Sequence, residues 1–285
     1  MHNKISAVAL ACLLCSPAWA DDDKDEEGYW SHVKTDWLGL EDGAKPFYFR
    51  AGYTLLSPNS SSSEVVLTDV EGPASLAISS GPIAGSGASI EDSQFPSVIV
   101  GYQFGSGRWA METILALPFT MKFKATGTLA SESIAPYANG NIPTGVPALG
   151  SEFGETKVLP PVVTLVYRFR LDKAFRPYVG AGPAYLYAYD SKVTNSVLTE
   201  VSQPGLEVDN AFGYALQTGI EYNFHSDWWV NFDVKYIGLK TSATVTNMYV
   251  NTPALETYEV AKVGDATIDV TADPWVYQLG VGFNF

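Results

Sequence analysis

The 285-residue chain combines 46% hydrophobic and 13% aromatic residues with only 17% charged residues, and it contains 25 glycines. Such a composition favours short strands over long helices. The formal net charge of −14 excludes a protein that binds the phosphate backbone, so we expect no nucleic-acid partner. No run approaches the roughly 18 apolar residues that a spanning helix needs, which excludes a helical membrane protein.

The start of the chain has the pattern of a secretory signal peptide. Lys4 provides a basic beginning, residues 5–15 are mostly apolar, and a small-residue cleavage site ends at Ala20. A strongly acidic run follows directly, which argues against the alternative of a short buried helix. We therefore predict a signal peptide over 1–20 and an acidic periplasmic segment over 21–45.

The two cysteines, Cys12 and Cys15, both lie inside the predicted signal peptide. Cleavage after Ala20 would leave a mature chain without cysteine, which excludes disulfide scaffolds, thiol catalysis and cysteine-bound metals. A lipoprotein with its lipid on Cys12 is a weaker alternative, because the apolar stretch before that residue would be very short.

Apolar and polar residues alternate with a period of two along most of the remaining chain, as half-buried strands require. Each alternating segment has about ten or more residues, the length that a tilted strand needs to cross a bilayer. The even number of segments, eight, is typical of bacterial outer-membrane barrels. They lie at 47–55, 95–104, 108–119, 158–169, 175–189, 211–224, 228–239 and 273–285.

Short and long connections alternate between these segments. The short ones have the length of hairpin turns, and the long ones are rich in Ser, Gly, Asn, Thr and Pro, which suits exposed loops. Over 46–285 this predicts an all-β fold, an eight-stranded antiparallel transmembrane β-barrel with short periplasmic turns and long extracellular loops. A soluble sandwich, the alternative, would not show such strict asymmetry. The turns lie at 105–107, 170–174 and 225–227, and the long stretches at 57–94, 120–157, 190–210 and 240–272.

The C-terminal segment alternates most regularly. Every second residue over 277–285 is apolar, and the last residue of the chain is aromatic. A soluble edge strand could show this pattern, but an exported barrel fits it better. We interpret Phe283 and Phe285 as an assembly signal, with the barrel-assembly machinery as partner.

Several stretches carry a family resemblance: Leu159-Pro160-Pro161, Phe175–Gly182, Gly219–Tyr222, Asp227–Asn231 and Asp273–Val276. With them the chain resembles, over about residues 46–285, the OmpW family of small outer-membrane proteins. The resemblance departs in the first two long loops, which are extended and rich in Ser, Gly and Ala. It implies an outer-membrane barrel of a Gram-negative bacterium and passive uptake of small hydrophobic compounds.

Six charged residues fall on the inward parity of the predicted strands. Three are positive and three negative, and this balance is expected because an unpaired charge in a narrow lumen is costly. We expect them to form an ionic layer in the periplasmic half that closes the lumen to water. The six are Arg50, Glu112, Arg168, Glu221, Asp233 and Lys235.

The same parity makes the outer half of the lumen apolar. Ordinary packing in a filled barrel explains this as well as a cup that receives a small hydrophobic molecule does. Because proline has no backbone N–H, Pro160 and Pro161 would weaken the strand ladder and let such a molecule leave sideways into the bilayer. Alternatively, the prolines only end the strand. The apolar lumen residues are Ile114, Ala116, Val162, Ala184, Leu186, Ile237 and Leu239.

Three functions are compatible with these sequence features. Uptake of hydrophobic molecules leads, and a structural or display barrel that acts through its loops in phage, bacteriocin or host recognition comes second. The third is a lipid-modifying enzyme, but only His32 and His225 remain after cleavage, and neither lies on the predicted outer rim to activate a nucleophile. We therefore predict no enzyme, no cofactor and no metal site. The expected partners are outer-membrane lipid, lipopolysaccharide and small hydrophobic solutes, with the oligomeric state left open.

Overall fold

The computed structural model describes residues 45–104, 107–225, 227–255 and 259–285. The predicted signal peptide, and the predicted acidic segment up to residue 44, lie outside the described residues. None of the helices in the described part of the chain is long and apolar enough to cross a membrane.

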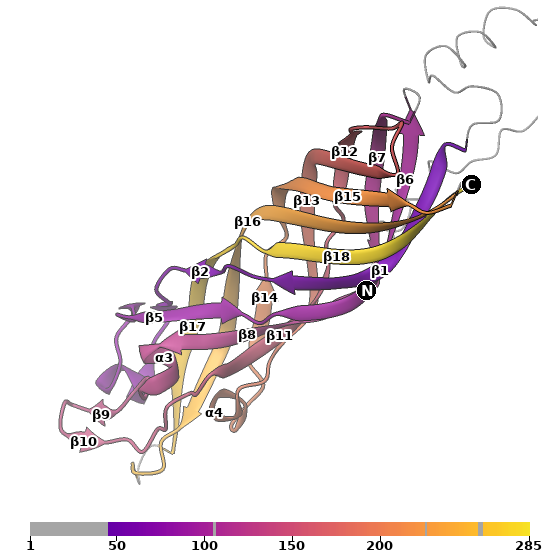
Figure 1. Ribbon diagram of the computed structural model, residues 1–285. Helices are drawn as coiled ribbons and strands as arrows, with labels where there is room; N and C mark the ends of the chain where they lie inside the picture. The colour runs from indigo at the N-terminus through magenta and orange to yellow at the C-terminus, as the bar shows by residue number, and fades with distance from the viewer. Residues whose placement is uncertain (1–44, 105–106, 226, 256–258) are drawn as a thin grey trace, which may run out of the picture.

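Eight antiparallel strands form a closed ring (Figure 1). Each strand pairs with its two neighbours, and the ring closes where the first strand pairs with the last, from Tyr48 opposite Asn284 to Ser57 opposite Trp275. Closure removes the two free edges that an open sheet would expose to lipid. The predicted eight-stranded barrel is confirmed. Its strands, in ring order, are β1 (Phe47–Ser57), β6 (Ser93–Phe104), β7 (Trp109–Ala116), β12 (Val163–Arg168), β13 (Phe175–Val193), β15 (Ala211–Asn223), β16 (Trp228–Asn251) and β18 (Trp275–Asn284).

Two of the predicted strands are interrupted. The strand predicted over 108–119 ends as β7 at Ala116, and β8 (Phe119–Gly127) begins after Leu117 and Pro118. The strand predicted over 158–169 is split into β11 (Glu152–Leu159) and β12, with Pro160 and Pro161 between them. Proline breaks the ladder at both places because it has no N–H to donate.

The prediction that the long connections are loops is wrong in large part. They contain strands that prolong β13 and β16 beyond the ring, and together these form a second β-structure, the extension, at the opposite end from the short turns (Figure 1). Its sheet runs in the order β4-β3-β17-β16-β14-β13-β11-β8-β5, with β2 paired to β17. The further elements are β2 (Ser61–Ser62), β3 (Val66–Thr68), η1 (Gly72–Leu76), β4 (Gly81–Pro82), β5 (Ser86–Ile90), α3 (Thr128–Ser131), β9 (Tyr137–Ala138), β10 (Ile142–Pro143), α4 (Ser196–Thr199), β14 (Gly205–Val208) and β17 (Val260–Ala272).

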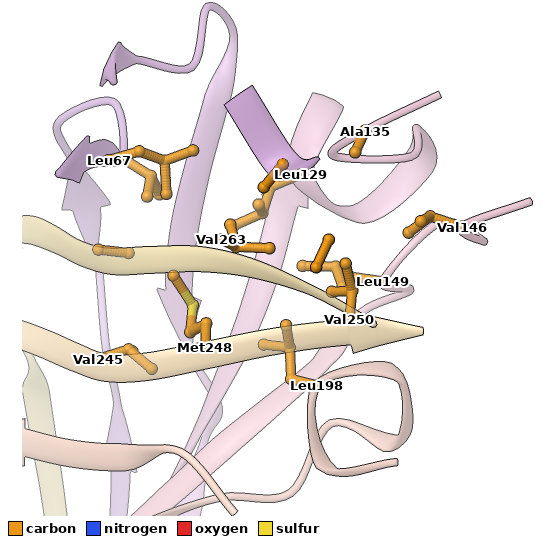
Figure 2. Packing of buried hydrophobic residues seen from close by; sticks show 14 of the residues in the cluster. Leu67, Leu129, Ala135, Val146, Leu149, Leu198, Val245, Met248, Val250 and Val263 are labelled. Atoms are coloured by element: carbon orange, nitrogen blue, oxygen red, sulfur yellow. The ribbon is translucent and has the colours of Figure 1, made fainter. Parts of the chain in front are cut away.

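The extension folds because it has a hydrophobic core of its own. Figure 2 shows Leu129, Leu198, Met248 and Val263 pointing toward one another between its strands. Leu198 and Val263 are fully buried, and burying such a side chain contributes roughly 1.5–3 kcal/mol. A small cavity of about 40 Å³ remains in this core, with only apolar surface around it.

The outer face of the ring is apolar and meets lipid. Leu216, Ile220, Phe232 and Leu279 point outward and are all more than one-third exposed. Aromatic rings gather at both ends of this apolar band, as they do at the two interfaces of a bilayer. Those near the short turns include Phe47, Trp109, Phe169, Phe175, Phe224, Trp228 and Phe285, and those near the extension include Tyr53, Phe212, Tyr214 and Trp275.

Candidate functional site

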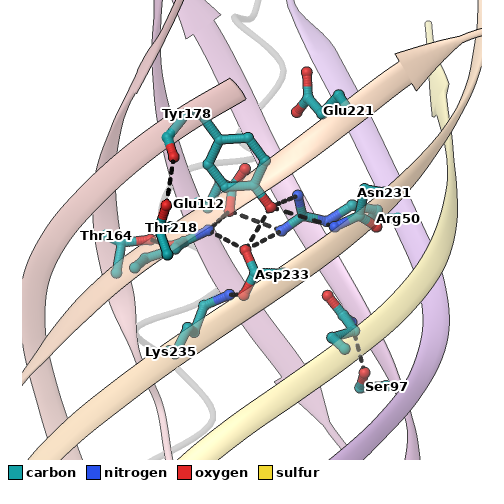
Figure 3. Close-up of polar contacts among 12 residues, drawn as sticks. Arg50, Ser97, Glu112, Thr164, Tyr178, Thr218, Glu221, Asn231, Asp233 and Lys235 are labelled. Carbon is teal, nitrogen blue, oxygen red and sulfur yellow. Dashed lines mark hydrogen bonds and ion pairs between the residues drawn. The ribbon is translucent and has the colours of Figure 1, made fainter. Parts of the chain in front are cut away.

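The structure brings the six inward charges together in one buried layer, which we call the plug. Each of the six residues is at most 3% exposed. Arg50 Nη2 lies 2.9 Å from Glu112 Oε2 and 3.8 Å from Asp233 Oδ2, and Lys235 pairs with Asp233 (Figure 3). Thus these four residues form one continuous ion-paired group.

The other two charges form a pair that is attached to this group. Arg168 donates from Nε to both carboxylate oxygens of Glu221, at 3.1 Å each. Its Nη2 also lies 3.6 Å from Glu112 Oε1. Glu112 therefore connects the Arg168–Glu221 pair to Arg50, and the layer spans the lumen from β1 to β15.

Three uncharged polar residues that the sequence did not single out complete the plug. Tyr48 donates to Glu112 Oε1 at 2.5 Å, and Tyr178 donates to Asp233 Oδ2 at 2.5 Å. Gln217 donates to both of these carboxylates, at 2.9 and 2.7 Å. Strand parity could have found Tyr48 and Gln217, because they share the inward parity of Arg50 and Glu221 on the same strands.

Aromatic rings fill the space that the charges leave. Tyr48, Tyr178 and Trp229 each lie directly across the ladder from a glycine of the next strand. A Cβ at Gly219, opposite Tyr178, would lie 2.3 Å from the tyrosine oxygen, so only glycine leaves room for the ring. The other two glycines are Gly101, opposite Tyr48, and Gly282, opposite Trp229.

The apolar cup lies on the extension side of the plug. Six of the seven predicted residues line one cavity of about 70 Å³, while the side chain of Ala116 lies outside what the structure describes. The six are Ile114, Val162, Ala184, Leu186, Ile237 and Leu239. The structure adds residues that the sequence analysis did not assign to the cup, chiefly Leu56, Phe95, Phe119, Met121, Phe123 and Val158.

Phe119, Met121 and Phe123 belong to β8, which lies outside the ring of eight strands, and all three line the cup. Their alternation with Thr120 and Lys122 was a signal in the sequence, but most of this segment fell in a stretch predicted to be a loop. The cup is therefore built partly by the ring and partly by the base of the extension.

Pro160 and Pro161 lie at a gap in the ladder. The pairing of β7 with β12 ends with the bond from Ile114 N to Val162 O at 3.3 Å, and pairing resumes only where Phe119 lies opposite Val158. Among the described residues, no ladder pair joins the two strands between these points. We call this gap the proline seam.

The seam is open on one side only. Toward β13 the chain stays attached, because Tyr185 N donates to Pro161 O at 3.0 Å. Across the gap, Leu117 is 75% exposed and precedes Pro118. The wall of the cup is thus weakest between β7 and β12, beside exposed leucine side chains.

Within the described residues, no group of three or more His, Cys, Asp or Glu residues is placed to hold a metal ion.

Comparison with known proteins identifies the family. The chain is 29% identical to outer membrane protein W of Vibrio cholerae over 242 residues, 84% of this chain and 88% of that one. It is 24% identical to the dibenzothiophene metabolism operon protein DoxH of Pseudomonas sp. over 203 residues, 71% of this chain and 77% of that one. The crystal structure of OprG from Pseudomonas aeruginosa has the same fold, with a TM-score of 0.61 at 23% identity, covering 85% of this chain and 96% of that chain. The OmpW family model matches residues 44–285. The chain therefore belongs to the OmpW family, whose members are non-enzymatic barrels of the Gram-negative outer membrane.

Proposed function

We propose that this barrel lets small hydrophobic molecules cross the outer membrane passively, through the cup and out at the proline seam. The observation that carries the proposal is the position of the cup directly against the plug. Among the described residues, no charged side chain lines the cup, whereas the plug beside it holds six buried charges. The cup therefore accepts an apolar molecule, and the plug stops it.

The axial route is closed on energetic grounds. A molecule that passed through the plug would have to separate pairs such as Arg50–Glu112 and Arg168–Glu221, which are buried and hydrogen-bonded. Separating a buried pair leaves uncompensated charge, at a cost of roughly 3–5 kcal/mol for each pair. Passage through the proline seam separates no such pair. Exit into the bilayer between Pro160 and Leu117 is therefore the cheaper route.

Solute entry requires side chains to move. The cavity of about 70 Å³ is smaller than the roughly 150 Å³ that holds benzene in a protein interior. Met121 lines the cavity, and its flexible side chain adapts readily to a guest. We expect the cup to widen when a solute occupies it.

A continuous run of apolar side chains leads to the cup from the extension. Ile268 packs against the core of the extension and against a small cluster of Ile90, Val270 and Ala272. Met121 packs against that same cluster and against the cup. This supports entry through the extension. The name of DoxH, which refers to the metabolism of dibenzothiophene, an apolar aromatic compound, fits this class of solute.

The test uses vesicles with lipopolysaccharide in the outer leaflet, because plain lipid does not hold back hydrophobic molecules. Protein-containing vesicles should take up an apolar dye, 1-N-phenylnaphthylamine, faster than empty vesicles, and should not take up a charged dye. Ala184→Phe, which fills the cup, should abolish the difference. Equal uptake by wild type and Ala184→Phe would remove the transport proposal and favour a barrel that displays its extension.

A further inference from the structure

The wall of the barrel has a second interruption, between β6 and β8. Pairing of β6 with β7 ends where Ser97 lies opposite the backbone of Ala116, and pairing of β5 with β8 begins where Ile90 lies opposite Phe123. A single backbone bond, from Glu91 N to Lys122 O at 3.0 Å, lies between these points among the described residues.

A cleft of about 340 Å³ occupies this interruption, and we call it the side cleft. Its lining alternates along both strands. Gln94 and Thr120 are exposed, whereas Ser93 and Phe119 are half-buried. The cleft thus leads from the outside of the barrel into its wall. It is lined by Glu91, Asp92, Ser93, Gln94, Phe119, Thr120 and Lys122.

The rim of the side cleft is polar and held in place by neighbours. Ser57 donates to Asp92 Oδ1 at 3.1 Å, and the Tyr53 hydroxyl donates to Gln94 Oε1 at 3.3 Å. Tyr53 belongs to the aromatic group near the extension, which places the cleft at the level of lipid headgroups.

The charges of the rim balance. Lys124 Nζ lies 2.8 Å from Glu91 Oε1, and its hydrogen bond lowers the pKa of this carboxyl below its ordinary value. The glutamate is therefore ionised at neutral pH. Asp92 and Lys122 add one further charge of each sign. Because these four charges sum to zero, the rim has no net charge that would draw in ions of one sign, which suits an uncharged molecule.

Phe119 lines both the side cleft and the cup, and among the described residues it is the only one common to the two linings. Its ring stacks on that of Phe95, with 4.3 Å between the ring centroids and 16° between the planes. Toward β6 the backbone of Phe119 is in no ladder pair among the described residues, and Pro118 precedes it. The ring can therefore turn away without breaking the sheet on that side.

We propose that Phe119 is a gate between the cup and the side cleft, and that the gate admits uncharged molecules with an apolar body and one polar group. The apolar body enters the cup, while the polar group stays among the hydroxyl and amide groups of Ser93, Gln94 and Thr120. This inference rests on the proposed function insofar as the cup is taken as the place where a solute lies.

A labelling experiment tests the gate without measuring transport. The sequence has cysteine only at Cys12 and Cys15, so a reporter Ile237→Cys in the cup would be unique in a chain cleaved after Ala20. N-ethylmaleimide, an uncharged molecule with one polar imide and an apolar tail, serves as the probe. Its reaction with the folded, reconstituted protein is followed by intact mass.

Phe119→Ala should accelerate labelling of the reporter at least tenfold. Phe232→Ala is the matched control, because it removes the same ring from the outer face of the ring of strands, where Phe232 lines neither the cup nor the cleft. It should leave the rate within about twofold of the parent. Thr120→Trp, which fills the mouth of the cleft, should return the rate of Phe119→Ala toward the parent value.

Equal acceleration by Phe119→Ala and Phe232→Ala would overturn the gate, because it would indicate a generally looser barrel. No acceleration by a folded Phe119→Ala would also overturn it. Folding is judged by heat-modifiable migration on gels. If Phe119→Ala fails to fold, Phe119→Leu replaces it, and we expect a smaller acceleration of labelling.

Failure of the proposed function can be distinguished from failure of the gate. Wild-type vesicles that take up no apolar dye, together with a labelling rate that still depends on Phe119, would support the gate and remove transport. The class of solute that the gate admits is tested separately. The vesicle assay is repeated with two apolar dyes, one of which carries an additional hydroxyl group. Thr120→Trp should slow only the hydroxylated dye, and equal slowing of both would overturn the class.

Discussion

The Arg168–Glu221 pair of the plug offers the sharpest test of how its charges are held. Both side chains are at most 4% exposed, and Arg168 Nε donates to both oxygens of Glu221 at 3.1 Å. The two partners are not equivalent. Without Glu221, Arg168 keeps Glu112 at 3.6 Å, whereas without Arg168 no other cation in the described structure lies within 4 Å of Glu221.

The magnitudes follow from this asymmetry. Removing one partner of a buried pair costs about 3–5 kcal/mol of unfolding free energy. We expect Glu221→Gln near the lower end, about 3 kcal/mol, and Arg168→Gln near the upper end, about 5 kcal/mol. The double variant restores neutrality and leaves two amides that can bond to each other. It should cost no more than Arg168→Gln alone, which corresponds to a coupling energy of about 3 kcal/mol.

The assay is reversible urea unfolding of the reconstituted barrel, followed by tryptophan emission. Trp229 is 3% exposed and lies against the plug, with its ring centroid 5.7 Å from the Arg50 guanidinium carbon. Heat-modifiable migration provides a second probe of folding. The reasoning would be refuted if the free-energy changes of the two single variants summed to that of the double variant within about 0.5 kcal/mol. The two residues would then be solvated separately and the lumen would be open to water.

Three further predictions concern the wall and the two ends of the chain. The double variant Pro160→Ala with Pro161→Ala restores two backbone donors, each worth roughly 0.5–1.5 kcal/mol. It should therefore be at least as thermally stable as wild type, yet slower in dye uptake. Unchanged uptake by a folded variant would remove the proline seam as the exit. Deletion of Phe285 removes its backbone bond to Phe47 O, 2.9 Å long, and its packing on Phe49, so assembled protein should fall severely, and normal amounts of the heat-modifiable form would contradict the role of this residue. The exported chain should begin at Asp21, and intact mass would reveal any other start or a lipid on Cys12.

The periodicity of the sequence was enough to determine the ring and the faces of its strands. A strand places successive side chains on opposite faces wherever it lies, so parity alone put Arg50, Glu112 and Asp233 inside and Leu216 and Phe232 outside. The structure places all five as parity does. Neither assignment depends on knowing which strands are neighbours.

Pairing across the lumen required the tertiary structure. Arg168 and Glu221 are 53 positions apart, and parity gives the same inward direction to every charge of the plug. Which two meet depends on ladder register and on the tilt of the strands around the ring, and both are set by closure of the whole sheet.

The extension, and with it the full lining of the cup, was also decided by tertiary structure. The stretches 57–94 and 120–157 contain buried apolar residues such as Leu67, Leu129 and Val146, but the many Ser, Gly and Pro residues around them hide any regular period. These apolar residues acquire a common core only when β13 and β16 rise beyond the ring and other strands pair with them. The sequence by itself determined what each strand of the ring presents to lipid and lumen, because that is local geometry. What closes over the lumen depends on pairing between segments that are distant in the sequence, such as β5 with β8 and β3 with β17.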